Sequence, residues 1–262
     1  MRGMTRDSLA ELFDRKILWV FAVLTVFAML GAAASRSLNA RMRSSGADWQ
    51  TVKGEVMSIA MNSLDAFVAL LVFLAVMASA SAVPHMLERG RADYFLSKPI
   101  SRKSLLLSKL SSTWVVYSAV VVLAGFLVFG TISLIHELFD PRVFWLLGMA
   151  AVSMLVWLSI TFAAGIFSGS TAMAIITAFM TWIVQTVLAG REGLKMFFNS
   201  DIADAIVDGL YYIFPKTSEL SKLGLALALG ESVDNWLPLW SSLLFGVGVM
   251  TVALVYFTRK DY

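Results

Sequence analysis

Six apolar runs, each close to twenty residues long, constrain this chain more than any other feature of its sequence. A helix of about twenty apolar residues crosses the hydrocarbon core of a bilayer, and it satisfies its own backbone hydrogen bonds there. With 58% hydrophobic and 15% charged residues, the composition agrees. We therefore predict an all-α polytopic membrane protein with a single transmembrane domain, residues 1–262. Its spans are expected at about 17–34, 64–83, 114–135, 143–167, 172–189 and 238–257.

Short helices are predicted outside the spans. Residues 4–16 have the pattern of an amphipathic helix, because Leu9, Leu12 and Phe13 share one face. Such a helix can lie in the membrane interface, although a mere extension of the first span is the alternative. Residues 201–230 are predicted to form two outer helices separated at Pro215. Both are too short to cross the bilayer, so they should lie in the outer interface or enter it as a re-entrant hairpin.

A basic loop, residues 84–112, separates the second and third predicted spans. Loops rich in Lys and Arg stay on the cytoplasmic side, and the tail at 258–262 is basic as well. Pro99 should end a short helix, because it has no N–H and disfavours the helical conformation at the preceding residue. Ser101 is placed to cap the next helix. With six crossings, both termini and this loop are expected on the cytoplasmic side.

Within the loop, one ordered series of residues resembles the segment between the second and third spans of bacterial ABC-2 type transporter permeases. The series is Glu88-Arg-Gly90, then Asp93, Phe95-Leu-Ser97 and Pro99-Ile-Ser-Arg102, followed by Leu106 and Lys109. Arg91 departs from the pattern, since the family often has Thr there. In that family the loop holds a coupling helix that docks on an ATPase subunit. The resemblance implies an ATPase-coupling role for Glu88, Arg89, Arg91, Asp93, Tyr94, Phe95, Ser97, Lys98, Pro99, Ser101 and Arg102.

The resemblance extends over nearly the whole chain, and it implies the type V exporter fold: an elbow helix, six spans, a cytoplasmic coupling helix and short outer helices before the last span. It also implies two permease copies with two copies of an ATP-binding cassette ATPase subunit, surrounded by lipid in the bacterial inner membrane. A nucleic-acid partner is not expected, because the net charge is only +3 and the basic residues lie mainly beside spans. The chain lacks a phosphate-binding loop, so we expect no catalytic residue, cofactor or metal in it and ATP hydrolysis in the partner.

Polar candidates for contact with a substrate are few. The interiors of the predicted spans contain no Asp, Glu, Lys, Arg or His, which disfavours a carrier coupled to protons or ions, because such carriers need ionisable groups at depth. Gln185 is the most polar side chain of the fifth span. We predict an interhelical hydrogen bond for it, with a contact in the substrate path as the alternative.

Two groups of residues elsewhere have metal-binding chemistry. One is His136 with Glu137 in the turn after the third span, and the other is Asp201, Asp204 and Asp208 in the first outer helix. Adjacent residues do not share a helix face, and a solvated helical face is the commoner role of spaced carboxylates. We therefore favour a solvated turn and a solvated helix over metal sites.

The leading functional hypothesis is a permease subunit that couples ATP hydrolysis by a separate subunit to export or extraction of a substrate. An uncharged cavity would suit lipids, hydrophobic drugs or peptides. The alternative is a membrane anchor that transmits ATPase-driven force or signal without transport, as in some ABC-2-like complexes that serve periplasmic metalloenzyme maturation. ATPase stimulation without transport in reconstituted vesicles would favour the anchor.

Overall fold

The computed structural model describes residues 10, 16–36, 49–87, 101–193 and 201–259. These residues form helices and no strand, and six segments are long and apolar enough to cross a membrane. The predicted all-α polytopic fold is thereby confirmed. The helices are α2 (Ile17–Ala34), α4 (Trp49–Ser79), α5 (Ala82–Met86), α7 (Arg102–His136), α8 (Val143–Ser168), α9 (Thr171–Ala189), α11 (Asp201–Ile213), α12 (Thr217–Leu229) and α13 (Leu237–Arg259).

Helix α8 forms the centre of the molecule. It packs against α4, α7, α9, α12 and α13, and Leu147, Leu158 and Ile166 on it are fully enclosed. A helix that is apolar all round is stable only where it is surrounded, and the sequence of α8 is apolar over its whole length. The helices that build the functional site therefore all pack against α8.

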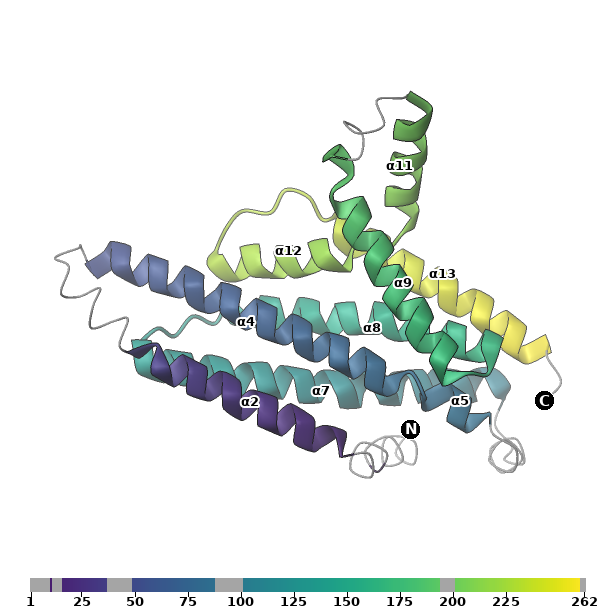
Figure 1. Cartoon of the computed structure of the whole chain (residues 1–262), viewed down its shortest axis with the longest axis horizontal. Helices are drawn as coiled ribbons and strands as arrows, with labels where there is room; N and C mark the ends of the chain where they lie inside the picture. The colour runs from purple at the N-terminus through teal and green to yellow at the C-terminus, as the bar shows by residue number, and fades with distance from the viewer. Residues whose placement is uncertain (1–9, 11–15, 37–48, 88–100, 194–200, 260–262) are drawn as a thin grey trace.

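The ends of the helices are arranged as six crossings require. The first turn of α2, the start of α7, the turn between α8 and α9 and the end of α13 all lie toward one end of the bundle (Figure 1). The start of α4 and the turn between α7 and α8 lie at the other end. The predicted elbow helix at 4–16 and the coupling helix at 88–97 fall outside the described residues, except for residues 10 and 16.

Helix α4 begins well before the predicted second span. The predicted spans leave residues 35–63 as the connection between them, but the chain is already helical from Trp49. The reason is packing: Met61, Leu64 and Val68 recur at helical spacing and are buried in the main core, and Val56 is buried against Leu138. Tertiary contacts thus stabilise a helix in a stretch whose polar residues and Gly54 indicate a loop.

Helix α7 is the longest helix in the described part of the chain, with 35 residues. Its start is capped as predicted, because the backbone N–H of Ser104 donates a hydrogen bond to Ser101 Oγ at 3.2 Å. Leu105 and Leu106, in the first turns, are buried. At about 1.5 Å per residue the helix is about 50 Å long, which is far more than a bilayer requires.

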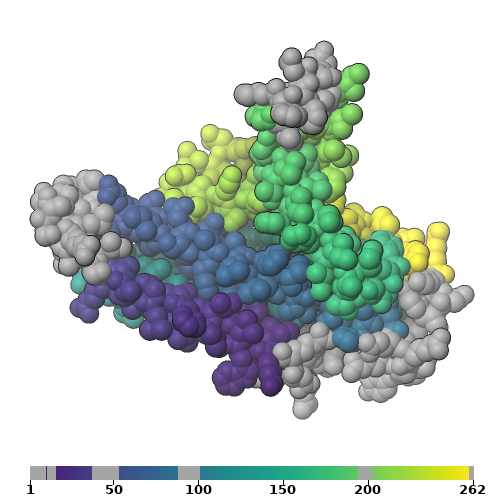
Figure 2. Space-filling model, viewed as in Figure 1, coloured from purple at the N-terminus to yellow at the C-terminus, as the bar shows by residue number. Residues whose placement is uncertain are grey.

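The two short outer helices differ in their placement. Helix α12 lies alongside α8 and α4, parallel to the neighbouring spans rather than flat across their ends (Figure 1). A Cβ on Gly224 would lie 3.2 Å from Leu146 Cα, so glycine permits the close approach of α12 to α8. Helix α11 instead stands out with α9 from the block that α2, α4 and α12 form on the face shown in Figure 2. The two short helices thus differ in how closely they pack against the spans.

Candidate functional site

A partly open cavity of about 120 Å³ lies among α4, α8, α9 and α12. One part of its wall is polar and is formed by Asp65, Gln185 and the hydroxyl residues of α12. The rest is apolar or aromatic. Its lining residues are Asp65, Val68, Ala69, Val72, Phe73, Val76 and Met77 from α4, Leu146, Met149, Ala150, Ser153 and Trp157 from α8, Ala178, Trp182 and Gln185 from α9, and Thr217, Ser218 and Ser221 from α12.

Gln185 joins α9 to the start of α12. Its Oε1 accepts a hydrogen bond from Thr217 Oγ1 at 2.6 Å and another from the Thr217 backbone N–H at 3.3 Å. Both side chains are buried. Lys216 is the N-cap residue of α12, and no side chain caps this end of the helix. Thr217 is the first helical residue, and its hydroxyl makes the bond to Gln185.

Asp65 contributes the only carboxylate among the cavity-lining residues of the described chain. Its Oδ1 accepts a hydrogen bond from Ser221 Oγ at 2.6 Å, which links α4 to α12. Asp65 lies at the start of the span predicted at 64–83. Because α4 begins earlier than that span, Asp65 is in the middle of a continuous helix, where its side chain is partly buried. The sequence suggested an uncharged cavity, whereas the lining of this cavity includes a carboxyl group.

Aromatic side chains form much of the apolar wall. Trp157 on α8 is 7% exposed, and Phe73 on α4 meets Trp182 on α9 with ring centroids 6.4 Å apart. Phe179 of α9 stacks on Trp182, with ring centroids 5.9 Å apart. Large rings supply rigid apolar surface at little entropic cost, so the wall is suited to hold a hydrophobic group.

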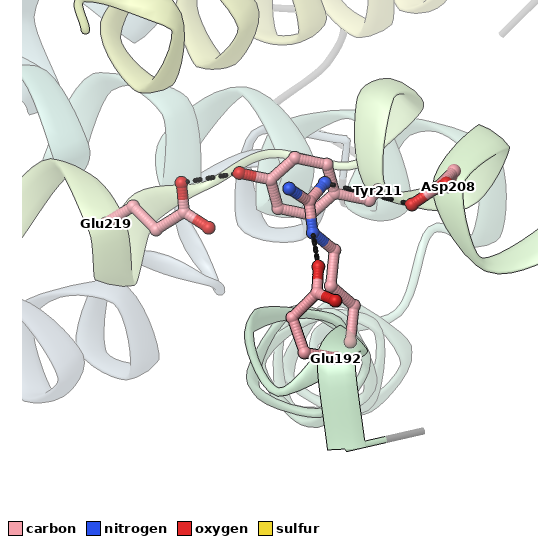
Figure 3. Close-up of polar contacts among 5 residues, drawn as sticks. Glu192, Asp208, Tyr211 and Glu219 are labelled. Carbon is pink, nitrogen blue, oxygen red and sulfur yellow. Dashed lines mark hydrogen bonds and ion pairs between the residues drawn. The ribbon is translucent and has the colours of Figure 1, made fainter. Parts of the chain in front are cut away.

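A cluster of charged and aromatic side chains lies where the end of α9 meets α11 and α12 (Figure 3). The Arg191 guanidinium lies over the Tyr211 ring, 3.9 Å from its centroid, and approaches Glu192 at 3.4 Å and Asp208 at 3.9 Å. The Tyr211 hydroxyl donates to Glu219 Oε2 at 2.8 Å. These contacts tie the end of α9 to α11 and α12.

Burial perturbs the titration of this cluster. Burial, the hydrogen bond to Glu219 and the charge of that carboxylate together raise the pKa of Tyr211 to about 12. Burial lowers the pKa of Lys216, and nearby Arg191 acts in the same direction while Glu219 opposes it. The Lys216 ammonium donates to Ser241 Oγ at 3.2 Å and lies 4.5 Å from the centroid of the Tyr211 ring.

A small crevice of about 10 Å³ lies between this cluster and the cavity. Gln185 and Ser218 line both the cavity and the crevice. Tyr211, Lys216 and Glu219 line the crevice but not the cavity. The volume is about that of one water molecule. The Gln185–Thr217 hydrogen bond thus lies where the two spaces are separated.

The predicted ATPase-coupling residues are only partly covered. Ser101 and Arg102 belong to the described chain and begin α7. The other nine, from Glu88 to Pro99, lie outside the described residues. Just after them, Lys109 is buried together with Leu105 and Leu106, so the last part of the predicted loop, from Leu105 on, already belongs to the packed bundle.

The two groups with metal-binding chemistry form no metal site among the described residues. His136 is 6% exposed, and its Nε2 lies 2.8 Å from Ser35 Oγ. The expectation of a solvated turn is therefore wrong for His136, which instead joins the ends of α2 and α7. On α11, Asp208 faces Arg191, as described above.

Six membrane-length helices, three of which line the cavity together with α12, define a multi-pass α-helical membrane protein. The chain belongs to the ABC-2 family transporter proteins, since the model of that family matches residues 8–262. This match confirms the resemblance noted in the basic loop. Membership makes the chain a permease subunit of an ABC transporter and implies association with an ABC ATPase subunit. No curated protein matches the sequence significantly.

Proposed function

We propose that the chain is the transmembrane subunit of a bacterial ABC exporter that couples ATP hydrolysis in a separate subunit to export or extraction of a substrate. Two permease copies would act with two ATPase copies in the inner membrane, with both termini and residues 84–112 in the cytoplasm. Closure of the ATPases would push on residues 88–97 and tilt the helices that follow. The family match over residues 8–262 carries this proposal.

Helix α7 supports the coupling role. It follows the basic loop directly, and it is one continuous helix from Arg102 to His136. It packs against α2, α4, α8 and α13. Because a packed helix of about 50 Å moves as a rigid body, a push at Ser101 would reach α4 and α8, which line the cavity.

The cavity supports a substrate path through a single permease copy. Gln185 lies at its boundary with the crevice beneath Tyr211. We assign the Gln185–Thr217 bond to the closed side of this path, so that a movement of α12 that breaks the bond would join the two spaces. Gln185 would then contact the substrate as it passes.

Phe95 provides the direct test of the coupling proposal. A large apolar side chain in a basic cytoplasmic loop is favoured only when a partner covers it, and burying one ring contributes about 1.5–3 kcal/mol. Phe95→Ala should therefore weaken association with the ATPase at least tenfold and abolish stimulation of ATP hydrolysis by the permease. Tyr94→Ala should act in the same direction. Association is measured by titrating purified ATPase onto permease held in nanodiscs.

Arg91→Ala is the matched comparison in the same segment. Rim charges affect encounter more than residence, so this variant should bind with a smaller loss that shrinks as salt is raised. Unchanged association in Tyr94→Ala, Phe95→Ala and their double variant would show that docking occurs elsewhere. A different result would identify the chain as a force-transmitting anchor: the wild-type permease stimulates ATP hydrolysis normally, but reconstituted vesicles that contain the complex transport no substrate.

Family membership also argues against an ion-coupled carrier, because an ABC permease draws its energy from the ATPase subunit.

A further inference from the structure

Asp65 has no cationic side chain beside it among the residues that the structure describes. The hydroxyl of Ser221 is its hydrogen-bond partner, and a hydroxyl leaves the charge of a carboxylate uncompensated. Two lysines stand next to the polar lining residues in sequence, Lys216 before Thr217 and Lys222 after Ser221, and neither lines the cavity. Lys216 directs its ammonium to Ser241 Oγ and Phe214 O, and Lys222 is exposed. An ionisable group inside a membrane bundle is costly unless it is paired, and it commonly marks a ligand site.

The cavity is elongated and has two chemically different ends. Asp65, Val68, Val72 and Val76 recur every three or four residues and so share one face of α4. From Asp65 to Met77 the helix rises about 18 Å. Asp65 stands at the hydroxyl-rich end with Ser221, whereas the Met77 end is apolar.

The aromatic side chains suit the apolar part of a ligand. Trp157, Trp182 and Phe73 line the same cavity as the carboxylate, and Phe73 follows Asp65 by about 12 Å of helix. A ligand that spans both parts would place a charged head group at Asp65 and an apolar body against the rings. An anionic head group would be repelled by the carboxylate, so the site disfavours it.

We propose that this cavity binds an amphiphilic organic cation, with one amine or ammonium group at Asp65 and an apolar body along Val72, Val76 and Trp157. Ser221 and Ser218 would accept or donate the remaining hydrogen bonds of the head group. A metal ion fits less well, because the described residues offer no group of three acidic or imidazole ligands. The proposal rests on the proposed function and names the substrate class of the same path.

Binding of matched ten-carbon probes tests this assignment. The full chain is held in phosphatidylcholine nanodiscs, and radiolabelled decylammonium, decanol and decyl sulfate are each titrated, with empty nanodiscs subtracted. Wild-type protein should prefer decylammonium to decanol by about tenfold or more, because a charge-assisted pair is stronger than a neutral hydrogen bond. Asp65→Asn should abolish that preference, since asparagine has nearly the same shape and can still accept from Ser221.

Two further variants separate charge from folding. Asp65→Glu keeps the negative charge and should retain the preference. Glu231→Gln removes an exposed carboxylate that does not line the cavity, and it should leave the preference unchanged. Asp65→Asn, Asp65→Glu and Glu231→Gln must each elute from a size-exclusion column at the same volume as the wild type, which shows that they are folded.

Several results would overturn the proposal: equal binding of the three probes, no binding above empty nanodiscs, or a preference that survives in Asp65→Asn. Displacement by sodium but not by choline at equal ionic strength would also do so, because it would identify an inorganic cation as the ligand. Binding is measured without ATP or ATPase. A failure of Phe95→Ala to uncouple the complex would therefore leave this result intact, and a lack of cation preference would leave the coupling proposal intact.

Discussion

At the residue scale, Tyr211 of α11 makes contacts with two other segments. Its ring lies under Arg191, which follows the end of α9, and its hydroxyl reaches Glu219 of α12. The ring contact requires only the aromatic face, while the hydrogen bond requires the oxygen. The two contributions can therefore be separated by removing the oxygen alone.

Tyr211→Phe should lower the free energy of unfolding by about 1 kcal/mol, because it deletes a hydrogen bond to a carboxylate and keeps the ring. The effect should depend on pH. The pKa is raised from 10.0 to about 12 in the folded protein, so the stability that this group contributes is complete below pH 10 and is lost as the pH rises through 12. Denaturant unfolding of wild type and variant on both sides of pH 10 measures this.

Tyr212→Phe is the control for that substitution. Tyr212 is 59% exposed, and its ring packs edge-on against Tyr211 at 5.6 Å, a contact that phenylalanine keeps. Its removal of a hydroxyl should cost little. Equal losses in the two variants, or a Tyr211→Phe effect that is the same at every pH, would contradict the assigned role of the Tyr211–Glu219 bond.

At the element scale, α12 depends on close packing against α8. Gly224→Ala should destabilise the protein by about 1–3 kcal/mol, because the added Cβ would lie 3.0 Å from Met149 Cβ and 3.2 Å from Leu146 Cα. This loss should exceed the gain in helix propensity, which is at most about 1 kcal/mol. Thermal unfolding of the purified chain measures the sum, and protease cleavage between residues 230 and 237 reports whether α12 has separated.

Gly209→Ala on α11 is the matched variant. Nothing lies within 4 Å of the Cβ that it would add, so only helix propensity changes and the protein should become slightly more stable. If Gly224→Ala also stabilised the protein, the packing of α12 against α8 would not be as close as described.

The same scale shows what the sequence could predict. Apolar runs identify spans because hydrocarbon accepts only helices with satisfied backbones, and α2 at Ile17–Ala34 illustrates this directly. Gln185 was recognisable as the most polar side chain of its span. Asp65 was not, because its significance depends on the early start of α4 and on Ser221, a residue 156 positions away. Its one usable signal was the helical spacing from Asp65 to Val68, Val72 and Val76.

At the scale of the whole molecule, six crossings place the loops on alternate sides. The start of α7 lies at the end of the bundle toward which the first turn of α2 and the end of α13 also point, while α12 ends near the opposite end (Figure 1). The basic residues of the 84–112 loop predict that the first of these ends is cytoplasmic. The charge of the basic loop thus predicts which end of the bundle is cytoplasmic, and the alternation of the crossings then predicts the side of every other loop.

The absence of cysteine from the chain makes that sidedness directly measurable. Single cysteines would replace Ser45 in the first connection, Ser104 in the exposed start of α7 and Ser232 after α12, and intact cells would be treated with a membrane-impermeant thiol reagent. We expect labelling at positions 45 and 232, and protection at 104 until the cells are opened. Positions 45 and 232 are also tested in opened cells. If all three positions were protected in intact cells and labelled only after opening, the result would show only that the reagent reaches the outer positions poorly from outside. Labelling of position 104 in intact cells, with protection at 45 and 232, would invert the molecule and place the basic loop outside. A cytoplasmic ATPase could not then reach the predicted coupling segment.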